Sequence, residues 1–216
     1  MVPRSTLTPD YQRDWPEYFA AVDGKPPRDT LLRALDAFDR EATSPRAFAI
    51  DIACGEGRDT RAILARATPR WSVLATDYHP EAIRLSMAKA DLEMLDRLAV
   101  AQLAMEDLPT KAPTPRTVDL INASFALPFC KPEAFGDVWA WITRSLRTGG
   151  RFSGQFFGDR DEWACIRPKS HRTRAEVESL LAPFDIEHVD EVVKEGDDAT
   201  GKVKLHHVFH IVAKKR

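Results

Sequence analysis

Short apolar segments alternate with amphipathic segments over most of the chain. Apolar residues that run together predict strands at 48–53, 71–77, 98–104, 117–125, 150–157, 184–194 and 203–213. Apolar residues that recur at helical spacing predict helices at 58–67, from 79 onward, at 132–147 and at 174–181. Alternating strands and helices form a mostly parallel sheet with helices on both faces. We therefore predict a seven-stranded α/β fold in which the closing hairpin adds an antiparallel strand at one edge.

The first 46 residues have a different pattern and carry no strand signal. Aromatic residues recur near helical spacing, the stretch DGKPP at 23–27 breaks the pattern, and a second amphipathic helix follows. We expect a helical segment over residues 1–46 and a separate domain over 47–216. The aromatic residues Tyr11, Trp15, Tyr18 and Phe19 form either a lid over a pocket or the packed face of a helix.

Charge and cysteine content restrict the partners and the compartment. The chain has 31 Lys and Arg against 33 Asp and Glu, a net charge of −2, which does not favour nucleic-acid or membrane binding. The chain has three widely spaced cysteines, Cys54, Cys130 and Cys165. This pattern favours free thiols in a reducing compartment over a set of disulfide bonds. We expect a cytoplasmic protein without a bilayer-spanning segment. Its oligomeric state stays open.

The stretch AFAIDIACGEGRDT at 47–60 predicts a ligand-binding turn after the first strand of the domain. Gly55 and Gly57 permit a tight turn and a close approach to a ligand. A dinucleotide fingerprint requires a third glycine, where this chain has Thr60. Asp51 lies in the strand, and Asp77 ends the next strand, where an acid can bind ribose hydroxyls. This pattern favours S-adenosylmethionine, which has an ammonium group and no phosphate. A nicotinamide-dependent oxidoreductase and a non-catalytic Rossmann-like binding module are the alternatives.

Four motifs in order resemble the class I S-adenosylmethionine-dependent methyltransferases. They are DIACGEGRDT at 51–60, ATDYHPEAI at 75–83, VDLINASFALPF at 118–129 and LRTGGRFSGQFF at 146–157. The resemblance implies a Rossmann-like sheet and an enzyme that uses S-adenosylmethionine. The residues it assigns to the cofactor are Asp51, Ala53, Cys54, Gly55, Gly57, Arg58, Thr60, Asp77, Tyr78, Met105, Glu106, Asn122 and Ala123.

The same resemblance assigns a part of the cofactor to each motif. Asp51 and the glycine turn would hold the methionine end, Asp77 the ribose, and Tyr78 would pack on the adenine. The family usually places an acid beside the adenine amino group, at a position where this chain has Ala104. Met105 would contact the ring there, and the neighbouring Glu106 or Asp107 would take the place of the acid.

The region after the fourth strand of the domain carries the prediction for the methyl acceptor. NASFALPFC at 122–130 lacks the N/D-P-P-Y/F tetrapeptide of enzymes that methylate amino groups in nucleic acids. It resembles instead the small tellurite-resistance and thiopurine-type methyltransferases, which implies a small-molecule acceptor such as a thiol, another soft chalcogen or another heteroatom nucleophile. The residues assigned to the acceptor are Tyr11, Trp15, Phe125, Pro128, Phe129, Asp159, Arg160 and Trp163. The alternatives are core packing for the aromatic residues and a salt-bridged loop for the charged ones; no catalytic base is assigned.

Three histidines near the C-terminus raise the question of a metal. In a strand, His206 and His210 share one face and His207 lies on the other. A third ligand at metal-site spacing does not accompany them in the sequence. We therefore expect these histidines to be structural or at the surface, and we predict no metal.

Overall fold

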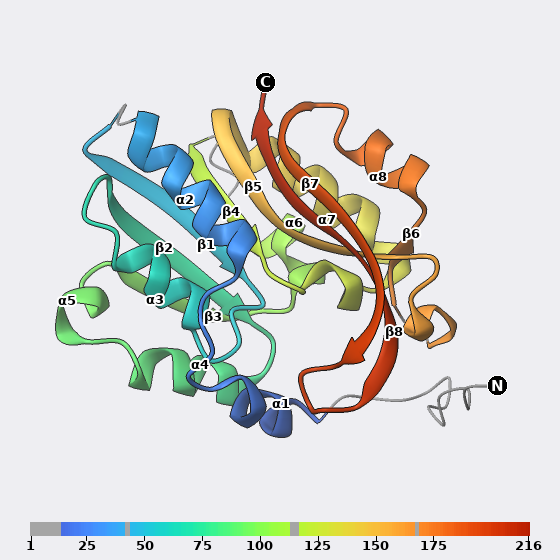
Figure 1. Cartoon of the computed structure of the whole chain (residues 1–216). Coiled ribbons are helices and arrows are strands. Elements are labelled where there is room, and N and C mark those ends of the chain that lie inside the picture. The colour runs from blue at the N-terminus through green and yellow to red at the C-terminus, as the bar shows by residue number, and fades with distance from the viewer. Residues whose placement is uncertain (1–13, 42–43, 113–116, 167–168) are drawn as a thin grey trace.

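The computed structural model of the chain describes residues 14–41, 44–112, 117–166 and 169–216. Its strands are β1 (Arg46–Ile52), β2 (Arg70–Asp77), β3 (Leu98–Gln102), β4 (Val118–Ala123), β5 (Leu146–Gly158), β6 (His171–Arg172), β7 (Phe184–Asp197) and β8 (Val203–Lys215). Its main helices are α1 (Trp15–Val22), α2 (Asp29–Glu41), α3 (Arg58–Leu64), α4 (Pro80–Ala88), α7 (Pro132–Ser145) and α8 (Arg174–Leu180) (Figure 1).

The strands form one twisted sheet in the order β3-β2-β1-β4-β5-β8-β7, and the short β6 pairs with β5. Strands β1 to β5 are parallel, whereas β8 runs antiparallel to both of its neighbours. Because chain order reverses between β1 and β4, the carboxyl ends of these two strands form a switch point, where ligands bind in open α/β sheets. The predicted α/β class is confirmed.

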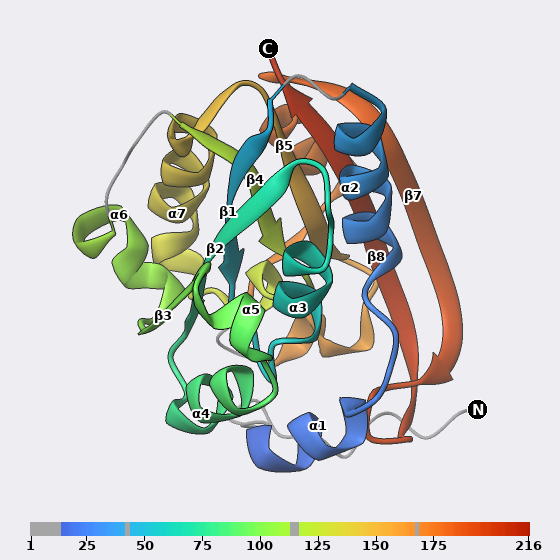
Figure 2. The same cartoon turned by 90° about the vertical axis from the view of Figure 1, so that its left-hand side faces the viewer.

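Helices cover both faces of the sheet. Helices α2 and α3 lie on one face, and α7 and α8 lie on the other (Figure 2). The amphipathic spacing of α2 explains its position, because Leu31, Ala34, Leu35 and Phe38 are all buried in one cluster with residues of β1, β2, β4 and β8. Helix α1 lies below the carboxyl edge of the parallel strands, apart from both layers (Figures 1 and 2).

Several short elements were not predicted. They are α5 (Leu92–Leu95), α6 (Leu108–Lys111), the 3₁₀ turns η1 (Met105–Asp107), η2 (Leu127–Phe129) and η3 (Glu162–Cys165), and strand β6. Each has two to four residues, too few for a period to be visible. Strands β7 and β8 also extend to Asp197 and from Val203 to Lys215, so their hairpin continues past the sheet toward α1 (Figure 1).

Candidate cofactor and acceptor site

The turn between β1 and α3 has an unusual backbone. Ala53, Gly55 and Gly57 all have positive φ, at 53°, 57° and 82°. A Cβ on Gly57 would lie 2.5 Å from Oγ and 2.9 Å from Cα of Ser86 in α4. Glycine is therefore required at residue 57 both by conformation and by the close packing of α4. Ala53 holds a left-handed conformation that disfavours a side chain, and backbone strain of this kind clusters at functional sites.

Asp77 at the end of β2 fixes this turn from the side. Its Oδ2 accepts a hydrogen bond from the Gly55 amide at 3.0 Å, and its Oδ1 accepts one from the His79 amide at 2.9 Å. Burial raises the pKa of Asp77 above its usual value, and these amides act in the opposite direction. Each carboxylate oxygen has two lone pairs, so both can accept a further hydrogen bond from a hydroxyl group.

A cavity of about 820 Å³ opens beside the turn, and we call it the turn cavity. It is lined by Asp14, Trp15, Pro16, Tyr18, Phe19, Ala53, Gly55, Asp77, Tyr78, His79, Leu103, Ala104, Met105, Glu106, Ser124, Phe125, Ala126, Phe129, Lys131 and Lys169. Six of the residues assigned to the cofactor from the sequence are among them: Ala53, Gly55, Asp77, Tyr78, Met105 and Glu106. Residues that follow the ends of β1, β2, β3 and β4 thus meet at one cavity.

Asp51 lies beneath the turn and does not belong to the residues that line the cavity. Its side chain is buried and accepts hydrogen bonds from Thr60 Oγ1 at 2.5 Å and Asn122 Nδ2 at 2.8 Å. Burial and the nearby Asp59 carboxylate raise the pKa of Asp51 to about 7. These contacts join β1, α3 and β4 below the turn; that Asp51 also holds the ammonium group of a cofactor stays a prediction.

Six further residues assigned to the cofactor lie outside the described lining of the turn cavity. They are Cys54, Gly57, Arg58, Thr60, Asn122 and Ala123. Thr60 and Asn122 bind Asp51, and Gly57 packs on α4, so these three support the turn from below.

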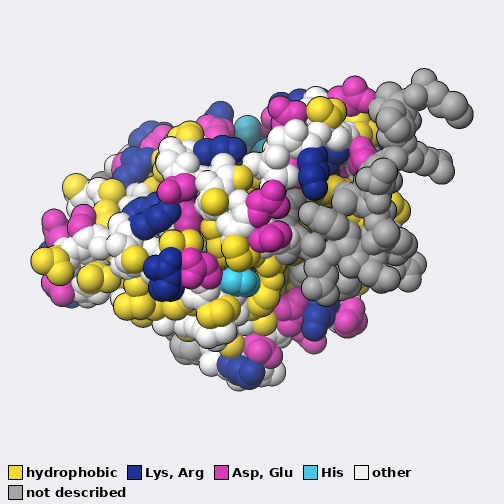
Figure 3. Space-filling view, turned by 90° about the horizontal axis from the view of Figure 1, so that it is seen from below, with side chains coloured by type: hydrophobic (Ala, Val, Ile, Leu, Met, Phe, Trp, Pro, Cys, Tyr) yellow, Lys and Arg dark blue, Asp and Glu magenta, His cyan; other side chains and the backbone are white. Residues whose placement is uncertain are grey.

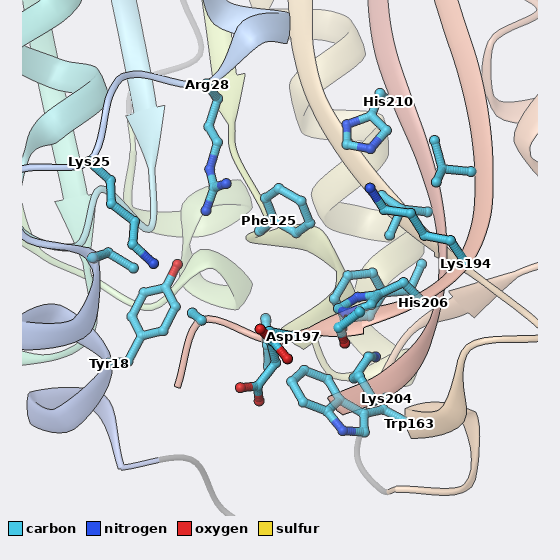
Figure 4. A pocket seen from close by; sticks show the side chains of 18 of the residues that line it. Tyr18, Lys25, Arg28, Phe125, Trp163, Lys194, Asp197, Lys204, His206 and His210 are labelled. Atoms are coloured by element: carbon cyan, nitrogen blue, oxygen red, sulfur yellow. Dashed lines mark hydrogen bonds between the residues drawn. The ribbon is translucent and has the colours of Figure 1, made fainter. Parts of the chain in front are cut away.

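A second cavity, of about 500 Å³, adjoins the first, and we call it the hairpin cavity (Figure 4). It is lined by Trp15, Tyr18, Val22, Lys25, Arg28, Phe125, Phe129, Phe157, Trp163, Val192, Lys194, Glu195, Gly196, Asp197, Asp198, Ala199, Lys204, His206, Val208 and His210. Four aromatic residues, Trp15, Tyr18, Phe125 and Phe129, line both cavities. The rings of Trp15 and Phe129 are 5.3 Å apart, and those of Trp15 and Tyr78 are 6.3 Å apart. Helix α1 therefore covers the place where the two cavities meet.

The acceptor residues predicted from the sequence divide into four groups. Trp15, Phe125, Phe129 and Trp163 line the hairpin cavity, and Tyr11 lies outside the described residues. Pro128 is buried in η2, behind the wall that Phe129 forms.

Asp159 and Arg160 lie outside the linings of both cavities as the described residues define them, and their assignment to the acceptor stays a prediction. The guanidinium of Arg160 binds Glu191 of β7 at 2.8 Å, and the Asp159 carboxylate lies 3.5 Å from Nδ1 of His207. Ion pairing with the outer face of the hairpin directs this loop away from the cavity. These contacts favour the alternative of a salt-bridged loop for the two residues.

The three C-terminal histidines have the alternation predicted for a strand. His206 and His210 line the hairpin cavity, and His207 lies on the opposite face, where Nε2 is 2.9 Å from a Glu191 carboxylate oxygen. Within the described ranges, no three Cys, His, Asp or Glu side chains are arranged to hold a metal.

Arg28, Gln155 and His210 belong to the surroundings of the hairpin cavity and were not assigned from the sequence. Gln155 is buried in β5, where its Nε2 donates to Thr30 Oγ1 and its Oε1 accepts from the Phe125 amide, both at 2.8 Å. These bonds fix the start of α2 on Phe125, whose φ is 53°. The residues come from three elements that only the fold brings together. The alternation of polar residues 204, 206 and 210 on one face of β8 is the signal that could have indicated part of this wall.

The outer surface around α1 is mixed in character. Seen from below, hydrophobic side chains gather around a histidine, with charged side chains of both signs nearby (Figure 3). Across the described ranges, none of the helices combines the length and apolar character needed to cross a membrane.

Comparisons with known proteins agree with this geometry. Residues 49–150 match the family described as methyltransferase domain. A search of curated protein sequences gives no match. Among solved structures, TehB from Haemophilus influenzae has a TM-score of 0.65 at 16% identity, covering 85% of this chain and 62% of that protein. The chain thus spans less than two thirds of the length of this relative.

Two further structures cover more of both chains. The 1,6-didemethyltoxoflavin-N1-methyltransferase of Burkholderia thailandensis, with bound 1,6-didemethyltoxoflavin and S-adenosylhomocysteine, has a TM-score of 0.60 at 21% identity and covers 93% of this chain and 84% of that one. A TehB-like methyltransferase from Corynebacterium glutamicum has a TM-score of 0.57 at 20% identity, with 94% of each chain covered. At these identities the likeness establishes the fold.

The fold, the turn and the matched residues together define the class. Residues 49–150 match a methyltransferase domain, and the fold around them resembles that of the TehB-type enzymes. S-adenosylmethionine is the cofactor that this match supports. The turn cavity fits this group: Asp77 presents carboxylate oxygens to hydroxyl groups, Tyr78 and Met105 offer flat and apolar surface, and Gly55 permits close approach.

Proposed function

We propose that this protein transfers the methyl group of S-adenosylmethionine to a small-molecule acceptor that binds in the hairpin cavity. One observation carries the proposal: the turn cavity and the hairpin cavity share four aromatic residues, Trp15, Tyr18, Phe125 and Phe129. A donor in the first cavity and an acceptor in the second would meet at this shared wall. The acceptor atom is a heteroatom nucleophile, with thiols and other soft chalcogens among the candidates.

The chemistry asks little of the protein beyond alignment and exclusion of water. When bound, S-adenosylmethionine supplies a methyl group that its sulfonium already activates. The shared aromatic wall holds the acceptor close to that group, and proximity of this kind supplies a large part of many enzymatic rate enhancements. We propose that α1 acts as a lid, because Trp15 contacts Tyr78 on the donor side and Phe129 on the acceptor side. The segment 1–46 would then be a cap on the domain at 47–216.

A nitrogen acceptor is a second candidate. The structurally similar enzyme from Burkholderia thailandensis is, by its name, a 1,6-didemethyltoxoflavin-N1-methyltransferase. A flat heterocycle would match the aromatic walls of the hairpin cavity, because flat rings stack favourably on aromatic side chains. The same positioning would serve a ring nitrogen or a sulfur atom.

Calorimetric titration with S-adenosylmethionine, S-adenosylhomocysteine and NAD tests the donor site. We expect both adenosyl ligands to bind and NAD to bind far more weakly. The variant Asp77→Asn should lose about 10- to 100-fold in affinity for S-adenosylhomocysteine, because it weakens hydrogen bonds to a charged acceptor. Asp96→Asn, at an exposed position at the end of α5, is the matched control and should bind normally. Preferential binding of NAD, or an Asp77→Asn affinity within twofold of the parent, would contradict the donor assignment.

A further inference from the structure

Arg28 enters the hairpin cavity without an acidic partner. Its guanidinium carbon lies 4.5 Å from the centroid of the Phe125 ring, and Figure 4 shows it pointing down into the cavity beside that ring. Among the described residues no carboxylate pairs with this guanidinium, and its Nε is buried without a hydrogen-bond partner. The neighbouring Asp29 binds Arg33 instead, at 2.5 Å. A permanent positive charge therefore faces the cavity beside the residues shared with the donor site.

The position of Arg28 is fixed by the buried Gln155. The two hydrogen bonds of Gln155 tie Thr30, two residues after Arg28, to the backbone of Phe125. The Arg28 amide also donates to Asp59 at 3.2 Å. A guanidinium stacked on an aromatic ring keeps its N–H donors in its own plane, where they can form two parallel bonds to a carboxylate. The site is therefore organised in advance for a planar anion.

Lys25 and Lys194 also line the hairpin cavity and add positive charge around Arg28 (Figure 4). His210 approaches Phe125 from the β8 side, with ring centroids 6.0 Å apart. Burial, with smaller contributions from His188 and Arg28, lowers the pKa of His210 despite the opposing acids Asp190 and Asp29. The imidazole is therefore largely uncharged at neutral pH. Lys204 is bound to Asp161, and Asp197 lies lower down, toward Trp163 (Figure 4).

The volume and the lining of the hairpin cavity indicate the size and shape of the ligand that it can hold. About 500 Å³ is in the range of cavities that hold drug-sized molecules and is far larger than an inorganic oxyanion needs. Aromatic side chains surround it: Trp15, Tyr18, Phe125, Phe129, Phe157 and Trp163. Flat apolar molecules pack well against walls of this kind.

We infer that the acceptor is a flat aromatic molecule with an anionic group, and that Arg28 selects it by binding that group. This inference rests on the proposed function, because it assigns the hairpin cavity to the methyl acceptor. It makes Arg28 a specificity-determining residue that touches the acceptor and not the donor, since Arg28 is absent from the described lining of the turn cavity.

The test measures binding of three probes to protein saturated with S-adenosylhomocysteine. The probes are 2-naphthoate, its uncharged analogue 2-naphthamide, and decalin-2-carboxylate, which has the charge without the flat rings. We expect 2-naphthoate to bind at least about 10-fold more tightly than 2-naphthamide, because a bidentate contact to guanidinium requires the carboxylate. It should also bind more tightly than decalin-2-carboxylate, because only a flat ring stacks on the aromatic walls.

Two variants distinguish a specific contact of Arg28 with the carboxylate probe from a general effect of positive charge on binding. Arg28→Gln should reduce the preference for 2-naphthoate over 2-naphthamide to within about twofold. Arg40→Gln removes an exposed charge at the far end of α2 and should retain the full preference. Melting temperature and affinity for S-adenosylhomocysteine should match the parent in both variants, which shows that each one is folded.

The outcomes distinguish this inference from the proposed function. If S-adenosylhomocysteine binds but the parent does not prefer 2-naphthoate, the inference is wrong and the donor site stands. A preference that survives in Arg28→Gln overturns the role of Arg28. Equal binding of 2-naphthoate and decalin-2-carboxylate overturns the requirement for a flat ring. If S-adenosylhomocysteine itself fails to bind, the proposed function fails at the donor site, which Arg28 does not line.

Discussion

Gly57 shows how much one residue of the turn contributes to the site. With φ of 82° and Ser86 Cα only 2.9 Å from the place of a Cβ, the position excludes a side chain for two reasons. Because a backbone atom of Ser86 blocks the space, a side-chain rotation in α4 cannot relieve the clash. The turn and α4 are thus locked together below the turn cavity.

Replacing Gly57 should lower the stability of the fold, because backbone strain and the clash with Ser86 add together. We expect Gly57→Ala to lower the free energy of unfolding by ~2–4 kcal/mol, the sum of left-handed strain and overpacking. Gly24→Ala is the control, since Gly24 has φ of 70° and no atom within 4 Å of an added Cβ. It should cost no more than ~1 kcal/mol. Urea denaturation measures both, and equal losses in the two variants would show that packing on α4 contributes nothing.

Residues that are close in sequence were predictable, and residues joined only by the fold were not. Asp77 and the glycine turn lie in two short motifs, and both line or fix the turn cavity as predicted. Arg28, Gln155 and His210 come from the start of α2, from β5 and from β8. Their hydrophobic neighbours indicate a helix and two strands, but no local pattern shows that these three side chains surround Phe125.

At the scale of elements, α2 is held on the sheet by a buried arginine as well as by apolar packing. Arg151 in β5 is 1% exposed and binds Glu41 at the end of α2 at 2.6 Å and Glu187 in β7 at 2.7 Å. The ring of Phe38 lies 4.6 Å from its guanidinium carbon. This cluster positions α2 at one end, while Thr30 and Gln155 position it at the other, next to Arg28.

The pKa of Glu41 predicts a specific response to acid. The hydrogen bond from Arg151 lowers the pKa of Glu41 to about 2, against 4.5 in its unperturbed state. The folded protein therefore binds this proton less readily than the unfolded chain, so the stabilisation is complete above pH 4.5 and is lost as pH falls toward 2. Because a third of the Glu41 side chain is exposed and water screens the pair, we expect ~1–2 kcal/mol at pH 6.

The measurement compares the parent with Glu41→Gln by chemical denaturation from pH 6 to pH 2. The difference in free energy of unfolding should shrink toward zero as the pH falls. Glu93→Gln, at an exposed position in α5, should show no such trend. A parent-minus-variant difference that does not change with pH would mean that the ion pair with Arg151 does not stabilise the docking of α2.

The elements themselves were predicted with uneven success for physical reasons. Four of the parallel strands, β1, β2, β4 and β5, are largely buried, and the partly exposed β3 is still mostly apolar, so the sequence pattern identifies all five. The ends of β7 and β8 carry Lys194, Asp197, Lys204 and His206, because one face of the hairpin lines a polar cavity. The apolar pattern therefore fades where the hairpin lines this cavity, and β7 was predicted to end at 194 instead of at Asp197. The start of β8 was predicted correctly, and only residues 214–215 at its far end were missed.

At the scale of the whole molecule, the site is the meeting point of two cavities below the carboxyl edge of the sheet. The parallel strands position the turn cavity, while the added α1 and the extended hairpin enclose the hairpin cavity (Figures 1 and 4). The sequence motifs belong to the first part and predicted it. The hairpin cavity also uses segments outside those motifs, among them α1 and the ends of β7 and β8, so the motifs alone do not indicate its full lining.

Methyl transfer itself is the most direct test of this arrangement. The protein is incubated with S-adenosylmethionine and, one at a time, 2-mercaptobenzoate, benzenethiol, phenol, selenite and tellurite, and S-adenosylhomocysteine is quantified by mass spectrometry. We predict that S-adenosylhomocysteine forms in equal amount with a methylated acceptor, most rapidly with the flat anionic thiol 2-mercaptobenzoate. Binding of S-adenosylmethionine without S-adenosylhomocysteine above the acceptor-free level, for every compound tested, would contradict transfer to a small heteroatom nucleophile.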